Sequence, residues 1–282
     1  MKQIVMLVIL AGTLVACSQP QAPDVHTQFI EDGDAHPLII LLGGSDGGNY
    51  FAAPEMHDVL TVYNDYGLSV ASLGYFATAS TPKRPTELSL NAINQRIVEL
   101  ASSPAIAENC IAVFGFSKGA ELALLLGSHF DTVQQVVAAY PSHVSWNAVR
   151  SPFSRSGWSL DGVPLDYINA PLLSFPMLYG MLSGEYLAAF EKPLQTASAA
   201  SLEKARIPVE NIAGPVVLIS GKQDEIWPSY AMATAIEQRL RQQGKHQIMH
   251  IALEGGHYSY DRHTMHEVLS FLQRTLVQQC QR

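Results

Sequence analysis

The chain has 282 residues, of which 48% are apolar, and a formal net charge of -8 at pH 7. This length and apolar content suffice for one globular domain with a sizeable core, so the composition requires no second domain. The negative charge argues against nucleic acid as a partner.

Residues 1–16 have the pattern of a bacterial export signal. Met1-Lys2-Gln3 is a short basic start, and the apolar stretch from Ile4 to Leu14 is too short to span a bilayer. The end of this segment, Leu14-Val15-Ala16-Cys17, resembles a lipobox, in which the cysteine is lipidated and becomes the first residue. Ser18 beside it resembles the outer-membrane sorting pattern. We expect an exported protein anchored through Cys17 to a bacterial membrane, with the periplasmic face of the outer membrane preferred over the inner membrane. A simple cleaved signal is the alternative.

Residues 17–36 are interpreted as a polar tether and residues 37–282 as the folded domain. The first core strand is predicted over Leu38–Leu42, and a glycine-rich loop, residues 43–48, follows it. Glycines allow the backbone of such a loop to approach a ligand closely. The loop fits neither GxGxxG nor a Gly-Lys-Ser/Thr pattern, which disfavours a phosphate site and leaves an ordinary strand-to-loop turn as the competing interpretation.

Apolar strand patterns alternate with helical patterns along the rest of the chain. The predicted strands are 38–42, 69–73, 111–114, 133–139, 215–220 and 247–253, and the predicted helices are 57–66, 88–102, 118–126, 229–243 and 263–279. This order predicts an α/β fold with a mainly parallel sheet of about six strands flanked by helices. Active groups of such sheets collect at the carboxyl ends of the strands.

Gly115-Phe116-Ser117-Lys118-Gly119 lies between an apolar strand pattern and a helical stretch. A strand that turns abruptly into a helix needs small residues two before and two after the turn, and the strained turn exposes the serine oxygen. The context predicts a nucleophile elbow with Ser117 as the nucleophile. Acyl transfer also needs two backbone N–H donors for the oxyanion. We assign them to Lys118, which follows the nucleophile, and to Ser45, with Gly44 as an open alternative to Ser45.

A serine nucleophile needs a histidine base and a carboxylate, which follow in the order Ser, Asp/Glu, His. Asp224 lies in a turn-rich loop after one predicted strand, and His257 lies in a loop after the last strand. Glu225 is the alternative acid and is interpreted as a solvated loop charge. His250 lies within a strand and is interpreted as a structural histidine. The sequence contains no HExxH or CxxC pattern, so we expect neither a metal nor a cofactor.

Residues 141–212 interrupt the alternation and are rich in aromatic residues. We expect them to form a helical cap insertion over the site. Most of the rings are interpreted as packing the cap against the core, so the substrate-binding residues stay unknown. The apolar residues Met177, Leu178, Met181 and Leu182 are interpreted as core.

Cys110 and Cys280 remain if Cys17 is lipidated, and an exported protein meets conditions that permit disulfides. Contact between them cannot be deduced from their spacing, so their pairing is left open.

Several segments together resemble one known family. They are Leu42-Gly43-Gly44-Ser45-Asp46-Gly47-Gly48, Gly115-Phe116-Ser117-Lys118-Gly119-Ala120, residues 207–215, residues 220–229 with Trp227-Pro228-Ser229, and Gly255-Gly256-His257-Tyr258. The chain resembles the catalytic C-terminal domain shared by the type-I acyl-CoA thioesterases and the bile acid-CoA:amino acid N-acyltransferase, which is related to the dienelactone hydrolases. The resemblance implies an α/β-hydrolase fold and triad roles for Ser117, Asp224 and His257.

The resemblance implies a serine-dependent acyl hydrolase, similar to the acyl-CoA thioesterases, that works through an acyl-enzyme on Ser117. The acyltransferase of that family uses a cysteine nucleophile, whereas Ser117 suits water as the final acceptor. The triad and the oxyanion loop are indifferent to whether oxygen or sulfur leaves, so a general carboxylesterase or a lactone hydrolase is an alternative. A surface lipoprotein that binds a hydrophobic ligand without turnover is another. We expect a monomer with a small-molecule acyl ester or thioester substrate.

Overall fold

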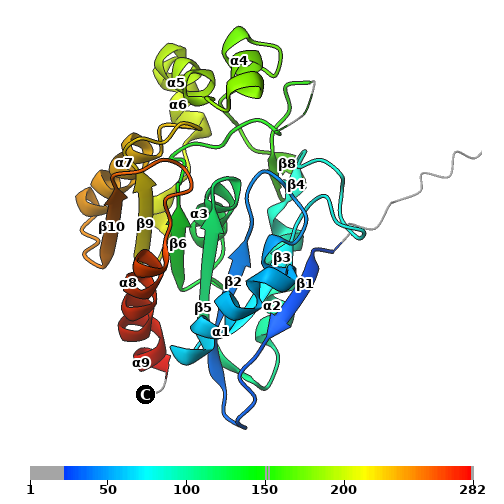
Figure 1. The fold of residues 1–282 in the computed structure, drawn as a ribbon, viewed down its shortest axis with the longest axis vertical. Helices are drawn as coiled ribbons and strands as arrows, with labels where there is room; N and C mark the ends of the chain where they lie inside the picture. The colour runs from blue at the N-terminus through cyan, green and yellow to red at the C-terminus, as the bar shows by residue number, and fades with distance from the viewer. Residues whose placement is uncertain (1–21, 150, 152, 281–282) are drawn as a thin grey trace, which may run out of the picture.

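The structure of the protein is a computed structural model that describes residues 22–149, 151 and 153–280. The predicted signal at residues 1–16, Cys17 and the start of the predicted tether lie outside the described residues. A central sheet carries helices on both faces, with further helices beyond one end of it (Figure 1). Its strands are β1 (Asp24–Gln28), β2 (His36–Leu42), β3 (Ser69–Gly74), β5 (Ile106–Phe116), β6 (Gln135–Ala139), β9 (Val216–Gly221) and β10 (Ile248–Leu253).

The strand order of this sheet is β1-β3-β2-β5-β6-β9-β10. All neighbouring pairs from β3 to β10 are parallel, and β1 pairs antiparallel with β3. The predicted α/β fold with a mainly parallel sheet is therefore confirmed, and the predicted strands correspond to β2, β3, β5, β6, β9 and β10.

The additional strand β1 falls inside the segment that the sequence predicts to be a tether. It pairs with β3 from Asp24 opposite Gly74 to Gln28 opposite Val70. The side chains of this edge strand are mostly exposed and polar, so the strand lacks the apolar alternation that marks a strand in a sequence. The tether prediction is wrong for these residues, because hydrogen bonds of the backbone place them in the sheet.

The side chains of β2 show how the core is divided. Leu38, Ile40 and Leu42 point to the face covered by α2 (Leu90–Ala101), α3 (Lys118–His129) and α7 (Ser229–Gln242). Ile39 and Leu41 point to the face covered by α1 (His57–Asp65) and α8 (Arg262–Leu272). A strand buried on both faces is a continuous apolar run, which is what the sequence shows.

None of the helices in the described ranges is long and apolar enough to cross a bilayer. The other helices of the described ranges are α4 (Phe175–Ser183), α5 (Leu187–Thr196), α6 (Ala199–Ala205) and α9 (Gln278–Cys280). Shorter turns are the 3-10 helices η1 (Tyr50–Ala52), η2 (Pro54–Met56) and η3 (Val209–Asn211) and the π-helix η4 (Gln273–Val277).

Residues 141–212, the predicted cap, contain α4, α5, α6 and η3, and α4 to α6 lie beyond the carboxyl ends of the strands, at the top of Figure 1. They also contain two strands of a small sheet with the order β4-β7-β8, which the sequence analysis did not predict. Its strands are β4 (Leu88–Ser89), β7 (Trp158–Leu160) and β8 (Val163–Pro164). Each is too short to produce a periodic pattern.

The interpretation of the α4 residues as core is wrong except for Met177, which is 9% exposed. Leu182 is 91% exposed, and Leu178 and Met181 are also exposed. The helix is apolar almost all round, and such a sequence normally indicates burial.

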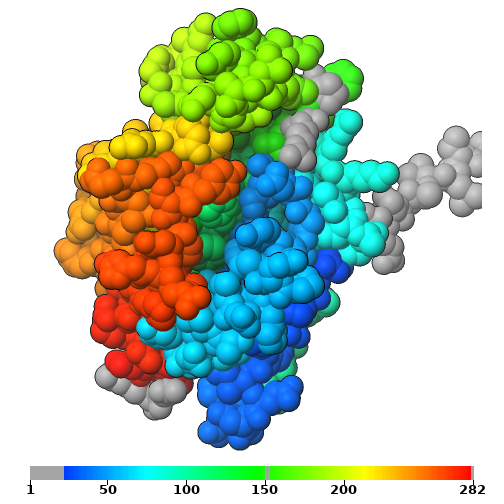
Figure 2. Space-filling model, viewed as in Figure 1, coloured from blue at the N-terminus to red at the C-terminus, as the bar shows by residue number. Residues whose placement is uncertain are grey.

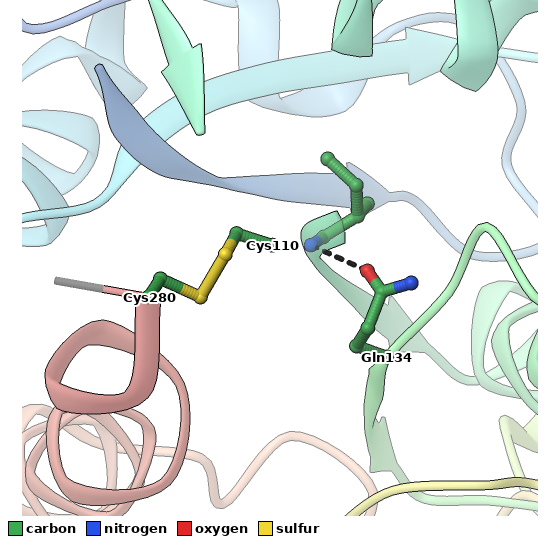
Figure 3. The surroundings of a disulfide bond; sticks show 4 residues. Cys110, Gln134 and Cys280 are labelled. Atoms are coloured by element: carbon green, nitrogen blue, oxygen red, sulfur yellow. Dashed lines mark hydrogen bonds between the residues drawn. A yellow bond between two sulfur atoms is a disulfide. The ribbon is translucent and has the colours of Figure 1, made fainter. Parts of the chain in front are cut away.

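A disulfide joins Cys110 of β5 to Cys280 of α9 (Figure 3). It answers the question that the sequence left open. Beside it, the side chain of Gln134 accepts a hydrogen bond from the backbone N–H of Ile111 at 2.8 Å. The disulfide thus ties the C-terminal helix to the strand that leads into Ser117.

Candidate active site

Ser117 lies at the turn between β5 and α3, with a backbone conformation of φ 55° and ψ -116°. A positive φ is costly for a residue with a side chain, so this turn is strained. The flanking glycines are needed because a Cβ at Gly115 would overlap the carbonyl oxygen of Gly119, and a Cβ at Gly119 would overlap that of Gly43. These close approaches are why the sequence has the Gly-x-Ser-x-Gly pattern here.

The structure brings Ser117, His257 and Asp224 together. The Oγ of Ser117 lies 2.9 Å from Nε2 of His257, and Nδ1 of His257 lies 2.8 Å from Oδ2 of Asp224. All three residues are less than 9% exposed. Oδ1 of Asp224 also accepts the backbone N–H groups of Ile226 and Trp227, which orient the carboxylate. In this geometry Asp224 holds the proton on Nδ1, so Nε2 is free to accept the serine proton.

Aromatic rings surround the imidazole of His257. The ring centroids of Tyr140, Tyr258 and Phe116 lie 4.9, 5.2 and 5.4 Å from its own. Burial raises the pKa of Tyr140, so its phenol stays neutral beside the imidazole. These rings restrict how the imidazole can turn and keep water away from its faces.

Glu225 does not contact the imidazole ring, although it was the alternative acid. Its carboxylate accepts the backbone N–H of His257 at 3.0 Å, and its carbonyl oxygen accepts the N–H groups of Tyr186 and Leu187 at the start of α5. The residue is half-buried. Its interpretation as a solvated charge is wrong, because it joins the histidine loop to the cap.

The two amides predicted to bind an oxyanion flank Ser117. Within the described ranges, neither the N–H of Lys118 nor that of Ser45 donates a hydrogen bond to another protein group. A Cβ placed on Gly44 would lie 3.4 Å from that of Ser117, so the backbone of this loop passes directly beside the Ser117 side chain. The choice between Ser45 and Gly44 stays open.

The side chain of Lys118 forms a buried network that the sequence analysis missed. Its Nζ lies 2.8 Å from Oε2 of Glu121, one turn along α3, and the two side chains are 2% and 0% exposed. Oε1 of Glu121 accepts the backbone N–H of Trp146 at 3.0 Å and the indole N–H of Trp158 at 2.6 Å. The Lys118 ammonium also lies 5.0 Å from the ring centroid of Trp158. Helix α3, which begins directly after Ser117, is therefore bonded directly to the predicted cap. A charged pair at i and i+3 just after Ser117 was the available sequence signal.

A second chain of serine, histidine and carboxylate occurs away from this site. Ser220 Oγ lies 2.8 Å from Nε2 of His250, whose Nδ1 lies 2.9 Å from Glu237. Ser220 is fully buried within β9 and has no elbow. His250 therefore has the structural surroundings that its position in a strand predicts, and Ser220 has no access to a substrate.

Two cavities meet at Ser117. The cap cavity, of about 320 Å³, lies under the cap and is lined by His257, Asn147, Met181 and Phe190 among others. The helix cavity, of about 530 Å³, lies between η1 and α1 on one side and α8 on the other. Ser45, Ser117 and Tyr258 line both. In Figure 2 a hollow opens below the cap, between blue and orange surfaces, with green atoms at its base.

The comparisons with known proteins agree with this geometry. The chain is 27% identical over 244 residues to acyl-coenzyme A amino acid N-acyltransferase 1 of Mus musculus, covering 83% of this chain and 54% of that protein. It is 25% identical over 193 residues to mitochondrial acyl-coenzyme A thioesterase 2 of the same species, covering 68% and 39%. The chain thus spans about half the length, or less, of these relatives.

Among solved structures, an esterase of Pyrococcus furiosus superposes with a TM-score of 0.55 at 19% identity, covering 90% of this chain and 88% of that chain. At this identity the likeness shows the fold alone. The family model described as BAAT / acyl-CoA thioester hydrolase C terminal matches residues 93–261, more than half of the chain and the part that holds the triad. The chain therefore belongs to the family of the BAAT and acyl-CoA thioester hydrolase C-terminal domains, within the α/β-hydrolase fold.

Proposed function

We propose that the chain is a serine-dependent acyl hydrolase that cleaves acyl thioesters, with acyl-CoA as the first candidate substrate. The observation that carries the proposal is the buried hydrogen-bonded chain from Ser117 through His257 to Asp224. Its position at the carboxyl ends of three strands, with two cavities open to the serine, gives a substrate access to the nucleophile. The family supports the thioester class.

The geometry accounts for each step of such a reaction. Nε2 of His257 takes the proton of Ser117 as Oγ attacks the carbonyl carbon, and Asp224 stabilises the resulting imidazolium. The negative oxygen of the tetrahedral intermediate accepts the N–H groups of Lys118 and of Ser45 or Gly44. The bond to sulfur breaks, and the thiolate takes the proton from His257. Water, deprotonated by His257, then attacks the acyl-enzyme, and the acid leaves as Ser117 regains its proton.

A carboxylic ester or a lactone is the second candidate, and the disulfide between Cys110 and Cys280 favours it. Disulfides persist outside the cytoplasm, whereas CoA thioesters are made within it. The same disulfide supports the proposal that the protein is exported. Lipidation at Cys17 stays a prediction, which Cys17→Ser tests: the variant should leave the membrane fraction of the producing cell, and unchanged partitioning would remove the anchor.

The test of the activity is a panel of acyl-CoA thioesters, phenyl esters and lactones with the full chain and two matched variants. Ser117→Ala should abolish turnover of every substrate, and Ser220→Ala should retain it, because Ser220 bonds to a histidine in the same way but is sealed from solvent. A fluorophosphonate should add to Ser117 alone in intact-mass and peptide analysis. Turnover that survives Ser117→Ala would overturn the proposal.

The relative rates on the panel separate the two candidates. Preference for thioesters over phenyl esters of the same acyl group supports the first candidate, and the reverse preference supports the second. Transfer of the acyl group to glycine in place of water, measured by mass spectrometry, would contradict hydrolysis as the main reaction.

A further inference from the structure

The two cavities at Ser117 differ in which catalytic group they expose. The imidazole of His257 lines the cap cavity. Among the described residues, Ser117 and Ser45 line the helix cavity, and His257 does not. A substrate bound for attack has two arms on its carbonyl carbon, the acyl chain and the leaving group. The two cavities that meet at Ser117 can each hold one of these arms.

Proton transfer from His257 determines which of the two cavities holds the leaving group and which holds the acyl chain. After attack, Nε2 of His257 must deliver its proton to the departing atom, so the leaving group has to lie on the side where the imidazole is exposed. That side is the cap cavity. The acyl chain is then directed past Ser117 and the loop of residues 43–48 into the other cavity.

The walls of the helix cavity suit an acyl chain. They include Phe51, Tyr63, Phe114 and Met265, all less than 9% exposed, and the side chains of Met56 and Val59. Apolar walls and flexible methionine side chains accept a hydrocarbon chain of varied length. The cavity volume of about 530 Å³ is within the range of small-molecule sites.

The charged residues at this cavity restrict the chemical class further. Asp58 and Asp261 line it together with one cation, Arg262, within the described part of the chain. A carboxylate at the far end of the acyl chain would meet a net negative boundary. The cavity therefore favours an uncharged acyl chain over a dicarboxylic one.

We propose that the helix cavity between α1 and α8 is the binding site for an uncharged, apolar acyl chain, and that the cap cavity receives the leaving group. This assignment rests on the proposed acyl-hydrolase function. The helix cavity then sets the preference for acyl chain length, and the cap cavity sets the preference for the leaving group.

The test fills one cavity at a time. Val59→Trp narrows the helix cavity from α1, and Met181→Trp narrows the cap cavity from α4. Val59→Trp should lower the ratio of kcat/KM for octanoyl to acetyl phenyl esters at least tenfold, the effect of about two buried methylene groups, and leave the ratio between CoA and phenol leaving groups unchanged. Met181→Trp should do the reverse. The opposite pattern, or no change in either ratio, overturns the assignment.

Binding of decanoate to Ser117→Ala, measured by calorimetry, tests the cavity without turnover. Val59→Trp in that background should weaken decanoate at least tenfold and Met181→Trp should not, while succinate should bind more weakly than decanoate in all three. If the wild type hydrolyses nothing but this binding pattern holds, the acyl-hydrolase function fails and the apolar site stands. If turnover is normal but Val59→Trp binds decanoate unchanged, the assignment fails alone. Should Val59→Trp not fold, as judged by circular dichroism, Val62→Phe narrows the same wall.

Discussion

The buried ion pair beside Ser117 leads to a quantitative prediction for Glu121→Gln. The substitution keeps the shape of the side chain but removes its charge, so the Lys118 ammonium is left unpaired at 2% exposure. Removing one partner of a buried pair typically lowers the free energy of unfolding by about 3 to 5 kcal/mol. For a chain of this size, that corresponds to a drop in Tm of about 6 to 20 °C.

The matched control is the exposed pair of Arg96 and Glu99, which has the same i, i+3 spacing and the same 2.8 Å separation. Its side chains are 35% and 47% exposed, so Glu99→Gln should change stability by less than about 1 kcal/mol. Urea unfolding followed by tryptophan fluorescence measures both. The double variant Lys118→Met with Glu121→Gln should be more stable than Glu121→Gln alone, because no buried charge remains.

The pH dependence gives a second measurement of the same effect. Burial lowers the pKa of Lys118 below the ordinary value of 10.5, and the charge of Glu121 opposes that decrease. Glu121→Gln removes the opposing charge and lowers this pKa further. Between the folded pKa and 10.5 the unfolded chain holds the proton that the folded variant has released, so stability rises with pH. The free energy of unfolding that Glu121→Gln lacks relative to the wild type should therefore become smaller from pH 7 to pH 10. A deficit that is constant with pH, or no larger than that of Glu99→Gln, would refute the reasoning.

Three further predictions concern the disulfide, an acid-sensitive histidine and the elbow. Cys110→Ser with Cys280→Ser should lower the free energy of unfolding by about 2 to 5 kcal/mol, because the bond closes a loop with a sequence separation of 170. Equal urea midpoints with and without reductant would contradict this. Burial, helped by the charge of Arg239, lowers the pKa of His143 from 6.5 to about 4, so the unfolded chain binds this proton first. Acidification from pH 6.5 to 4 should then lower the free energy of unfolding by up to about 3 kcal/mol, and in urea titrations of His143→Gln this part of the decrease should be absent. An unchanged decrease in the variant would show that His143 is not responsible. Ser117→Gly should be more stable than Ser117→Ala by about 1 kcal/mol, because glycine adopts the φ of 55° without strain. If both variants unfold at the same urea concentration, the elbow stores no strain.

The features that could be predicted from the sequence are those set by local physics. Strands buried on both faces, such as β2, need unbroken apolar runs, and those runs are visible without coordinates. The elbow requires Gly115 and Gly119 because the strand, the helix and the neighbouring loop touch there. The order of Ser117, Asp224 and His257 then follows from which strand ends meet at one sheet edge.

The features that could not be predicted depend on surroundings that are distant in the chain. Strand β1 is held by its backbone at a sheet edge, so its side chains carry no pattern. The residues of α4 are apolar on nearly all sides, and the sequence does not say that Leu182 and Phe175 face outward. The disulfide depends on where α9 packs against β5, which is set by the whole fold.

The two serine, histidine and carboxylate chains show why local context and geometry are both needed. The two chains have nearly the same distance between the serine oxygen and the histidine nitrogen. It is 2.8 Å for Ser220 and His250 and 2.9 Å for Ser117 and His257. The difference lies in the backbone. Ser117 stands on a strained turn that opens into two cavities, with free amides beside it in the described structure, whereas Ser220 is enclosed within a strand. A serine oxygen that no carbonyl carbon can reach cannot act as a nucleophile, even when a histidine accepts its proton. The elbow, more than the hydrogen bonds, therefore distinguishes the candidate nucleophile from a structural serine.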